Sequence, residues 1–429
     1  MVISTLSVWH RALCRHPVRR MAASCGLICA ALLHAPTGAQ PVPPLYTLEA
    51  LQARASRESP ALATSRAGQL AARAGITTAS AYPNPEVSLE PGRLGARRPG
   101  AETGASTALA LTQPIEMPAL RQARLHSATA RVDLAAAETV ALQSNLNAAI
   151  RDAFFNLIKT RAIRQALAED LVLTEQIRDV IAARVRIGEA PRFDILRADN
   201  EVAGMLKHLD ATVPRIRQAQ IALRQLVSPS LENEFDLAIS ATDTRILNQA
   251  DYLALQQAVL ERNPAVLLAR QTLSGAERQI ELERQQVLPR IELRAHHERA
   301  PSTHLTRIGA QVVLPLLDRR AGPIAEASAR AQRASLALAE HRFDAQAQFD
   351  GAWQAYQSAL IQVNAIEDGI LDRARQVLSV AEAAYRLGER GIIEYLDAQR
   401  QFRLVRTELL EARFELQRAR TDLERIAGR

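Results

Sequence analysis

Aromatic residues and cysteines are both scarce in this chain. Phe, Trp and Tyr make up 4% of its 429 residues, while hydrophobic residues as a whole reach 48%. This bias favours long helices that pack through small side chains over a compact core centred on aromatic rings. The three cysteines, Cys14, Cys25 and Cys29, lie near the start of the chain. The remaining chain therefore cannot use disulfides, cysteine-bound metals or a cysteine nucleophile.

Acidic residues are missing from residues 1–39, which carry four of the arginines behind the net charge of +7. The apolar stretch Met21–Leu33 follows these arginines, and "PTGAQP" then places Thr37 and Ala39 three residues and one residue before a cleavage point. This pattern predicts a secretory signal peptide over residues 1–39, with a buried N-terminal helix as the alternative. The two later cysteines lack the preceding residues of a lipid-attachment motif, so we expect no lipid anchor.

Long hydrophobic runs are also absent after residue 39. No stretch of 18 apolar residues occurs there, which argues against a transmembrane helix and leaves a periplasmic, a secreted or a strand-inserted outer-membrane protein. The glycine-rich phosphate loop, H-E-x-x-H and G-x-S-x-G are missing as well, so we expect neither an enzyme nor a bound cofactor. Basic residues alternate with Glu and Gln along helical faces, which indicates a solvated surface and not nucleic-acid binding.

The chain does contain a long internal repeat. The stretch "RVRIGEAPRFDILRADN" at residues 184–200 returns as "AYRLGERGIIEYLDAQR" at residues 384–400. Three further landmarks recur in the same order, and the four pairs have offsets between 200 and 204 residues. This period is far longer than that of a solenoid. It predicts a duplicated unit, with repeats at residues 40–227 and 251–429 around a linker at residues 228–250.

Each repeat is predicted to open with one helix and to close with two. The first helix spans residues 47–80 or 251–285, with Thr47 or Asp251 as its N-cap. The two later helices are expected to be broken only near the glycine turn. The last of them carries apolar residues alternately three and four apart down to Ile426, which is the heptad spacing of a coiled coil.

Between these helices each repeat is predicted to form a β-hairpin, at residues 84–116 and 288–317. Residues 290–296 and 307–314 alternate between apolar and polar side chains, as half-buried strands do. Four such strands cannot close a barrel, because a closed barrel needs about eight or more. If these strands meet lipid, several chains must share one barrel, since an open edge in a membrane leaves backbone groups unsatisfied.

These features resemble the TolC-like outer-membrane factors, the outer channels of tripartite efflux and type I export systems. The resemblance covers the chain after residue 39 and is carried by both glycine turns. "AYPNPEVSLE", "LTQPIEMPALRQARLHSATA" and "LPLLDRRAGPIAEA" are similar to the branch that exports cobalt, zinc, cadmium, nickel, copper or silver ions. The implied fold is mainly α with a small β part. It has long antiparallel coiled-coil helices and four strands per chain, and three chains form a 12-stranded β-barrel and an α-helical barrel.

The resemblance also implies a location, partners and a function. A homotrimer in the lipid of the outer membrane, with a long periplasmic extension, would meet a periplasmic adaptor (membrane fusion) protein and an inner-membrane RND transporter. It would conduct its substrate passively, and the branch implies heavy-metal cations. The alternatives are a channel for multidrug efflux or type I protein secretion, and a soluble periplasmic coiled-coil scaffold.

The two glycine turns carry the candidate site. By the resemblance, Gly188 and Gly388 each mark a helical hairpin at the periplasmic mouth of the channel. Tyr385 and Arg390 correspond to family residues that bond to the counterpart of Asp194 and hold the mouth shut. The resemblance therefore implies a lock between the first and the second repeat.

Two further acids follow the second turn. By the resemblance, Glu394 and Asp397 match a ring of luminal carboxylates, and such a ring at a constriction attracts cations and repels anions. The alternative for all these acids is an ordinary helix start, where the helix dipole favours negative charge.

Three histidines near the second hairpin loop are candidates for a metal contact. His296, His297 and His304 lie in "AHHERAPSTH", and imidazoles suit zinc or copper. They flank a loop and have no evident carboxylate partner, so the alternative is a set of exposed loop histidines.

Overall fold

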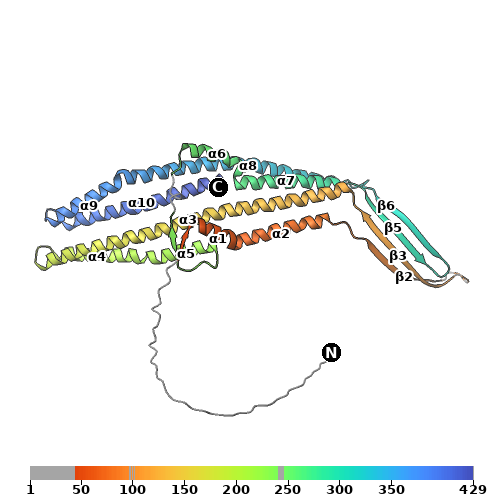
Figure 1. The fold of residues 1–429 in the computed structure, drawn as a ribbon, viewed down its shortest axis with the longest axis horizontal. Helices are drawn as coiled ribbons and strands as arrows, with labels where there is room; N and C mark the ends of the chain where they lie inside the picture. Colours follow the sequence, from red (N-terminus) through yellow and green to blue (C-terminus); the bar gives the residue numbers. More distant parts are fainter. Residues whose placement is uncertain (1–43, 96–97, 99, 101, 240–245, 429) are drawn as a thin grey trace, which may run out of the picture. The chain divides into compact units, whose positions relative to one another are not determined.

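The computed structural model describes residues 44–95, 98, 100, 102–239 and 246–428 (Figure 1). The predicted signal peptide and its cysteines lie outside these residues. None of the described helices combines the length and the hydropathy needed to cross a membrane. Most of the described residues are helical, and a four-stranded and a two-stranded sheet complete the fold.

The helices fall into two similar series. The first half of the chain contains α1 (Leu48–Glu58), α2 (Pro60–Ser80), α3 (Pro118–Arg186), α4 (Arg192–Asp210) and α5 (Thr212–Val227). The second half contains α6 (Gln249–Arg262), α7 (Pro264–Gln285), α8 (Ala321–Ala365), α9 (Leu371–Arg386) and α10 (Ile392–Ile426). The 69 residues of α3 span roughly 100 Å at 1.5 Å each. α3 packs against α2, α4 and α5 and also against α7 and α10, so it joins the two halves.

The prediction of a single opening helix in each repeat is wrong, because a proline divides each of them. α2 begins at Pro60 and α7 at Pro264, each directly after an extended residue, Ser59 or Asn263. Proline lacks an N–H and disfavours the α conformation in the residue before it, so a new helix begins at the proline. Asn263 stabilises the boundary between α6 and α7. Its side chain accepts hydrogen bonds from two N–H groups of α7 and donates one to the Ile426 carbonyl at 2.8 Å.

One of the two predicted N-caps is correct. The Thr47 side chain accepts a hydrogen bond from the N–H of Ala50 at 3.2 Å and caps α1. In the second repeat the cap is Asn248 and not Asp251. Asp251 lies three residues further on, and its carboxylate accepts from the Asn248 N–H at 2.9 Å. The two residues form a capping box, which satisfies two backbone donors at once.

The long helices are interrupted at more places than the glycine turns. α4 and α5 are separated at Ala211, because Pro214 cannot donate the N–H that would continue the helix to Asp210. In the second repeat the residues Ile366–Ile370 form a π-helical turn between α8 and α9. A π-turn of this kind widens a helix by one residue and lets the helix continue.

The four-stranded sheet combines the two repeats. Its strands are β2 (Glu86–Leu94), β3 (Gly104–Ile115), β5 (Arg290–Arg299) and β6 (His304–Val313), all antiparallel in the order β2-β3-β5-β6. The strand predicted at residues 290–296 is the first part of β5. The central β3–β5 pair joins residues 176 to 192 positions apart, from Ile115 opposite Ile291 to Thr107 opposite Arg299.

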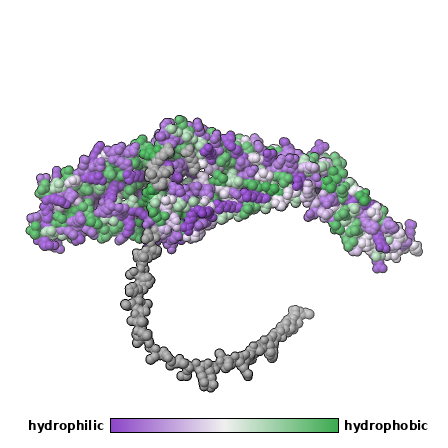
Figure 2. All heavy atoms as spheres, viewed as in Figure 1, coloured by the Kyte–Doolittle hydropathy of each residue, from purple (hydrophilic) through white to green (hydrophobic). Residues whose placement is uncertain are grey.

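The sheet has one apolar and one polar face, since successive side chains of a strand point to opposite sides. Through the register, the apolar face carries Val87, Leu89, Leu109, Leu111, Ile291, Leu293, Ala295, Ile308, Ala310 and Val312. The polar face carries Glu86, Glu90, Glu292, Arg294, His296, Glu298, Arg307 and Gln311. The apolar face is open within the single chain, with Ile308 86% exposed, and Figure 2 shows apolar side chains on the surface of the strands.

A second, smaller sheet was not predicted from the sequence. β1 (Leu45–Thr47) pairs in parallel with β4 (Asp236–Ala238). Each strand has three residues, too few for an alternating pattern to be recognised. This pairing brings the start of the first repeat against the segment between the repeats.

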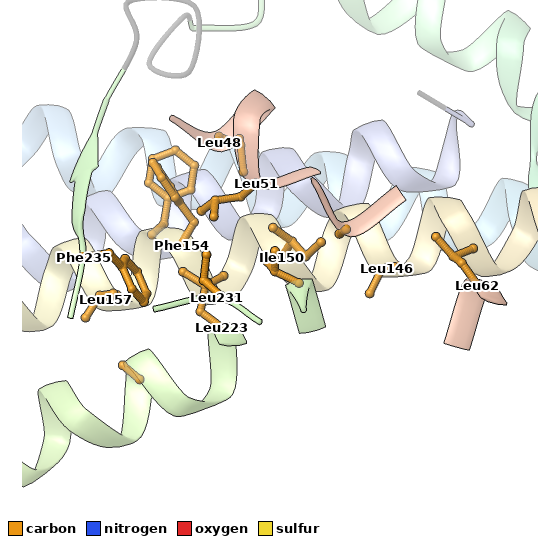
Figure 3. Close-up of a cluster of buried hydrophobic side chains, with 14 residues drawn as sticks. Leu48, Leu51, Leu62, Leu146, Ile150, Phe154, Leu157, Leu223, Leu231 and Phe235 are labelled. Atoms are coloured by element: carbon orange, nitrogen blue, oxygen red, sulfur yellow. The ribbon is translucent and has the colours of Figure 1, made fainter. Parts of the chain in front are cut away.

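Each half of the chain has its own hydrophobic core. The first contains Leu48, Leu51, Leu62, Ile150, Phe154, Leu157, Leu223 and Phe235 from α1, α2, α3, α5 and the following segment (Figure 3). The second contains Leu255, Val259, Phe349, Trp353, Tyr356, Leu423 and Ile426 from α6, α8 and α10. Both cores lie where the short helices α1 and α6 cover the long ones.

Candidate functional site

The two glycine turns have the same backbone hydrogen bonds. Gly188 and Gly388 have φ of 83° and 78°, a region that strains residues with a Cβ. Each glycine N–H donates to the carbonyl three residues back, at 3.2 Å and 3.1 Å, and the next N–H donates to the carbonyl five residues back, at 2.9 Å in both turns. This is the Schellman motif, which satisfies the last carbonyls of a helix.

The acids that follow each turn lie in the first turn of a helix. Asp194 is the third residue of α4 and is half-buried, while Glu394 is the third residue of α10 and is exposed. Asp397 lies one turn further along α10 and is exposed too. The helix dipole favours an acid at such a position, so the helix-start interpretation explains Asp194 and Glu394 without requiring a gate.

Tyr385 is buried between the two repeats. Its ring stacks on that of Tyr395 with the centroids 6.0 Å apart, and the guanidinium of Arg184 lies 5.3 Å from the Tyr385 ring centroid. Arg184 also donates a hydrogen bond to the Tyr385 carbonyl at 3.1 Å. The hydroxyls of Tyr385 and Tyr395 are buried and have no hydrogen-bond partner in the described structure. Burial raises the pKa of Tyr395 above its ordinary value.

The residues of the predicted lock do not meet within the single chain. In the described part of the chain, the Asp194 carboxylate has no hydrogen bond or ion pair with Tyr385 or Arg390. Arg390 is exposed beyond the second turn. A bond between Arg390 and Asp194 therefore requires another copy of the chain or a different conformation of the turns.

Arg390, Glu394 and Asp397 do come together. They line an open groove of about 720 Å³ between α9 and α10, together with Val377 and Val380. The groove therefore joins one guanidinium and two carboxylates to an apolar surface. Asp194 is not among its lining residues.

Sequence reasoning missed Arg184 and Tyr395. Both occupy positions where the repeats differ, since Arg184 corresponds to Ala384 and Tyr395 to Ile195. An alignment of the two repeats shows these replacements, but it cannot show that the changed residues meet. Only the packing of α3 against α10 brings them to Tyr385.

The three candidate histidines do not converge. His296 points to the polar face of the sheet, 3.7 Å from the Glu298 carboxylate, while His297 and His304 lie on the apolar face. The Nδ1 atom of His297 is 2.9 Å from the Thr306 hydroxyl. Within the described residues, no three His, Cys, Asp or Glu side chains are grouped so that they could hold a metal ion.

Comparison with known protein families gives one match that spans most of the chain. The model of the family described as outer membrane efflux protein matches residues 51–228 and 255–429. The chain is also 24% identical over 362 residues to the cobalt-zinc-cadmium resistance protein CzcC of Cupriavidus metallidurans (strain CH34), and the alignment covers 83% of each protein.

Solved structures show the same fold. A membrane protein from Pseudomonas aeruginosa superposes with a TM-score of 0.74 at 20% identity, over 89% of this chain and 90% of the other. The channel protein CusC superposes with a TM-score of 0.77 at 18% identity, over 89% and 92%. The predicted fold, mainly α with a small β part and TolC-like, is therefore confirmed.

Proposed function

The chain belongs to the outer membrane efflux protein family, and from that premise we propose that three copies form the outer-membrane channel of a tripartite pump that exports heavy-metal cations. The channel would bind a periplasmic adaptor and receive its substrate from an inner-membrane RND transporter. It would act as a passive conduit, with no catalytic step of its own.

The observation that carries the proposal is the open sheet. In the described structure, β2 and β6 each have one edge without a partner strand, and the apolar face is exposed. An exposed apolar face is unfavourable in water, and unpaired backbone groups at a sheet edge are unfavourable in lipid. The single sheet is therefore costly in either surrounding. Three copies would join β6 of one chain to β2 of the next, giving twelve strands with a lipid-facing apolar band.

The heavy-metal substrate rests on the similarity to the cobalt-zinc-cadmium resistance protein. Deleting the gene should lower tolerance to cobalt, zinc or cadmium and leave tolerance to organic antibiotics unchanged. The opposite result would favour a multidrug channel, and a loss of secreted protein would favour type I export.

We further propose that the glycine turns form the periplasmic gate. Arg390 is exposed, and it has no ion pair in the described chain, so its guanidinium can meet Asp194 of a neighbouring helix pair. An arginine–carboxylate bond is charge-assisted and directional, but at an exposed site each is worth about 1 kcal/mol or less. Three such bonds in a trimer can bias a gate and still be broken when the adaptor binds.

Conductance in planar bilayers tests this gate. Arg390→Ser combined with Tyr385→Phe should raise conductance without dissociating the trimer. The control is Arg386→Ser, because Arg386 ends α9 just before the same glycine turn and pairs with Glu382 of its own helix at 2.6 Å. Equal conductance of wild type and the double variant would show that Arg390 and Tyr385 do not close the channel.

Ion selectivity tests the carboxylates. Glu394→Gln combined with Asp397→Asn should reduce cation preference and weaken block by multivalent cations, because six carboxyl charges would be lost from the trimer. Glu408→Gln is the control, since Glu408 is another exposed acid of α10. If the control and the double variant select alike, the two acids do not set the ion selectivity.

A further inference from the structure

We propose that the loop end of the apolar face binds the phosphate groups of an outer-leaflet lipid whose headgroup carries two phosphates. The proposal rests on the proposed function, because it requires the sheet to lie in the outer membrane. The binding surface consists of Arg93, His297, Arg299 and His304, which we call the basic rim.

The strand register places the basic rim at one end of the apolar face. Arg299 lies opposite both Thr107 and His304. Arg93 lies opposite Ala105, which is two residues nearer the loops than Thr107 and so one row further along the same face. His297 lies in the preceding row, beside Leu109. All four side chains are exposed. The helices join the strands at the opposite end of the sheet (Figure 1), so the rim lies at the far end of the sheet from the helices.

Charge is segregated between the two faces. All four glutamates of the strands, Glu86, Glu90, Glu292 and Glu298, point to the polar face. On that face two of the basic groups have acidic neighbours: Arg294 pairs with Glu292 at 2.8 Å, and His296 lies 3.7 Å from Glu298.

The basic rim has no such neighbours. Within the described residues, neither Arg93 nor Arg299 has an ion pair, and no strand acid shares their face. Exposed guanidinium groups without an acid of their own chain beside them are free to bind an anion from outside the chain. That partner must be adjacent to an apolar phase, which describes a lipid headgroup.

The height of the apolar band fits this position. From Ile291 to Arg299 the chain advances eight residues along β5, or roughly 26 Å at 3.3 Å per residue. A strand tilted by about 40° in a barrel would cover roughly 20 Å of this along the membrane normal. The apolar band of such barrels is about 25 Å tall. The Arg299 backbone would therefore lie about 5 Å inside the edge of the band, and its long side chain would extend the guanidinium to headgroup level.

The spacing of the arginines favours a headgroup with two phosphates. Arg93 on β2 and Arg299 on β5 are separated by β3 and by one row, which is roughly 12 Å between backbones. Each guanidinium can grip its own phosphate through two parallel hydrogen bonds. The imidazole of His304, next to Arg299, supplies a further polar contact to the same phosphate.

Lipid binding by the full-length protein tests the proposal. The probe is diphosphorylated lipid A in phosphatidylcholine nanodiscs that hold the purified channel, and bound lipid is counted by native mass spectrometry. The test variant is Arg93→Gln, Arg299→Gln, His304→Gln. The control is Arg290→Gln, Arg294→Gln, His296→Gln, which removes the same residue types from the polar face of the same sheet.

We expect the rim variant to bind lipid A about 30-fold more weakly, which corresponds to two basic residues at a charged lipid surface. The control should bind as the wild type does, and monophosphoryl lipid A should bind more weakly than the diphosphorylated form. Inorganic phosphate should not displace the lipid, because the apolar band contributes to binding.

Several outcomes would overturn the proposal. They are equal losses in rim variant and control, equal binding of the phosphorylated lipid and phosphatidylcholine, and displacement by inorganic phosphate. Conductance in phosphatidylcholine alone separates this inference from the proposed function. A channel that conducts but does not select lipid A refutes only the rim, whereas a protein that never inserts refutes both.

Discussion

The two glycine turns have nearly identical backbones and very different surroundings. Both place a glycine at positive φ and both form the same two hydrogen bonds. Yet Leu396 after the second turn is 3% exposed, while its counterpart Leu196 after the first is 60% exposed.

The second turn is the centre of a small core. Leu378, Tyr385, Ile392, Tyr395, Leu396 and Ala398 pack together with Ile181 of α3 and Ala198 of α4. The first turn contributes only two fully buried side chains to this cluster. Its own large apolar residues point away, with Phe193 62% exposed.

The difference shows that duplication preserved the turn and not its packing. Backbone geometry depends on a glycine and on local hydrogen bonds, and both repeats keep them. Burial depends on what lies opposite, and α10 packs against both α9 and α3. Exposed apolar side chains such as Phe193 and Leu196 are typical of a surface that contacts another chain, in agreement with the proposed trimer.

The largest expected effect is the difference in stability between truncations of the two matched leucines. Leu396→Ala should lower the free energy of unfolding by about 2–5 kcal/mol, because it removes a buried side chain. Leu196→Ala should change it by less than about 0.5 kcal/mol in the dissociated chain. Thermal unfolding followed by circular dichroism measures both. Similar losses in the two variants would contradict the comparison.

A half-buried acid in the first repeat has no counterpart in the second. Asp152 of α3 corresponds to Ala352 at the 200-residue offset, and one of its oxygens is buried without a partner in the described structure. Burial first, and then the negative charge of Asp422, raise the pKa of Asp152 from 3.8 to about 6, against the lowering effect of Arg418, Arg425 and Arg151.

Because this pKa is higher in the folded than in the unfolded state, protonation favours folding. The stabilisation is present below about pH 4 and is lost as the pH rises through about 6. Asp152→Asn should therefore be more stable than wild type at pH 7.5, by about 1 kcal/mol after allowance for solvent screening. The difference should vanish at pH 4. Asp133→Asn, an exposed acid of the same helix, is the control, and the same pH profile in both variants would refute the assignment.

The glycines themselves should behave alike, in contrast to the leucines. Gly188→Ala and Gly388→Ala should each cost about 1 kcal/mol, because a Cβ is strained at positive φ although it would meet no neighbour within 4 Å. Gly204→Ala is the control: Gly204 lies inside α4 with open space around it, so alanine there should stabilise by up to about 1 kcal/mol. A clearly larger cost at one turn than at the other would mean that the turns are not equivalent in backbone strain.

The smallest expected effect concerns the tyrosine hydroxyls of the second turn. Tyr385→Phe and Tyr395→Phe should each stabilise the chain by less than about 1 kcal/mol, because a buried hydroxyl without a partner is unfavourable. Tyr356→Phe should have the opposite sign, since the Tyr356 hydroxyl accepts a hydrogen bond from the Leu247 N–H at 2.7 Å. Destabilisation by Tyr385→Phe would indicate that its hydroxyl is bonded in the assembled channel.

Sequence patterns predicted the repeat and much of the secondary structure, because these depend on local signals, whereas the TolC-like fold was implied by the resemblance to a known family. The alternation at residues 290–296 marked the start of β5, and the heptad spacing marked the seam of α10, whose residues Leu409, Ala412, Leu423 and Ile426 are buried. Local signals were misread where two competed. Pro60 and Pro264 mark the repeat, but each also begins a helix, which the predicted single opening helix does not include. Asp251 is the predicted cap, whereas the actual cap is Asn248, three residues earlier.

The candidate site was predicted only in part. Arg390, Glu394 and Asp397 share one groove, and their grouping follows from their spacing on one helix and its turn. The lock between Asp194 and Tyr385 stays a prediction, and within the single chain Arg184 occupies the face of the Tyr385 ring. The contact of Arg184 with Tyr385 joins residues 201 positions apart, and no local pattern encodes such a pair.

The sequence by itself determined the duplication, the positive-φ glycines and the two-sided strands, since each follows from the conformational needs of a few neighbouring residues. Only the tertiary structure decided that β3 pairs with β5, that Leu396 is buried while Leu196 is exposed, and that the rim arginines share a face without an acid. These outcomes depend on contacts between residues far apart in the chain. The free energy of such contacts comes from surface removed from water and from charges brought together, and neither quantity exists until the helices and strands have packed.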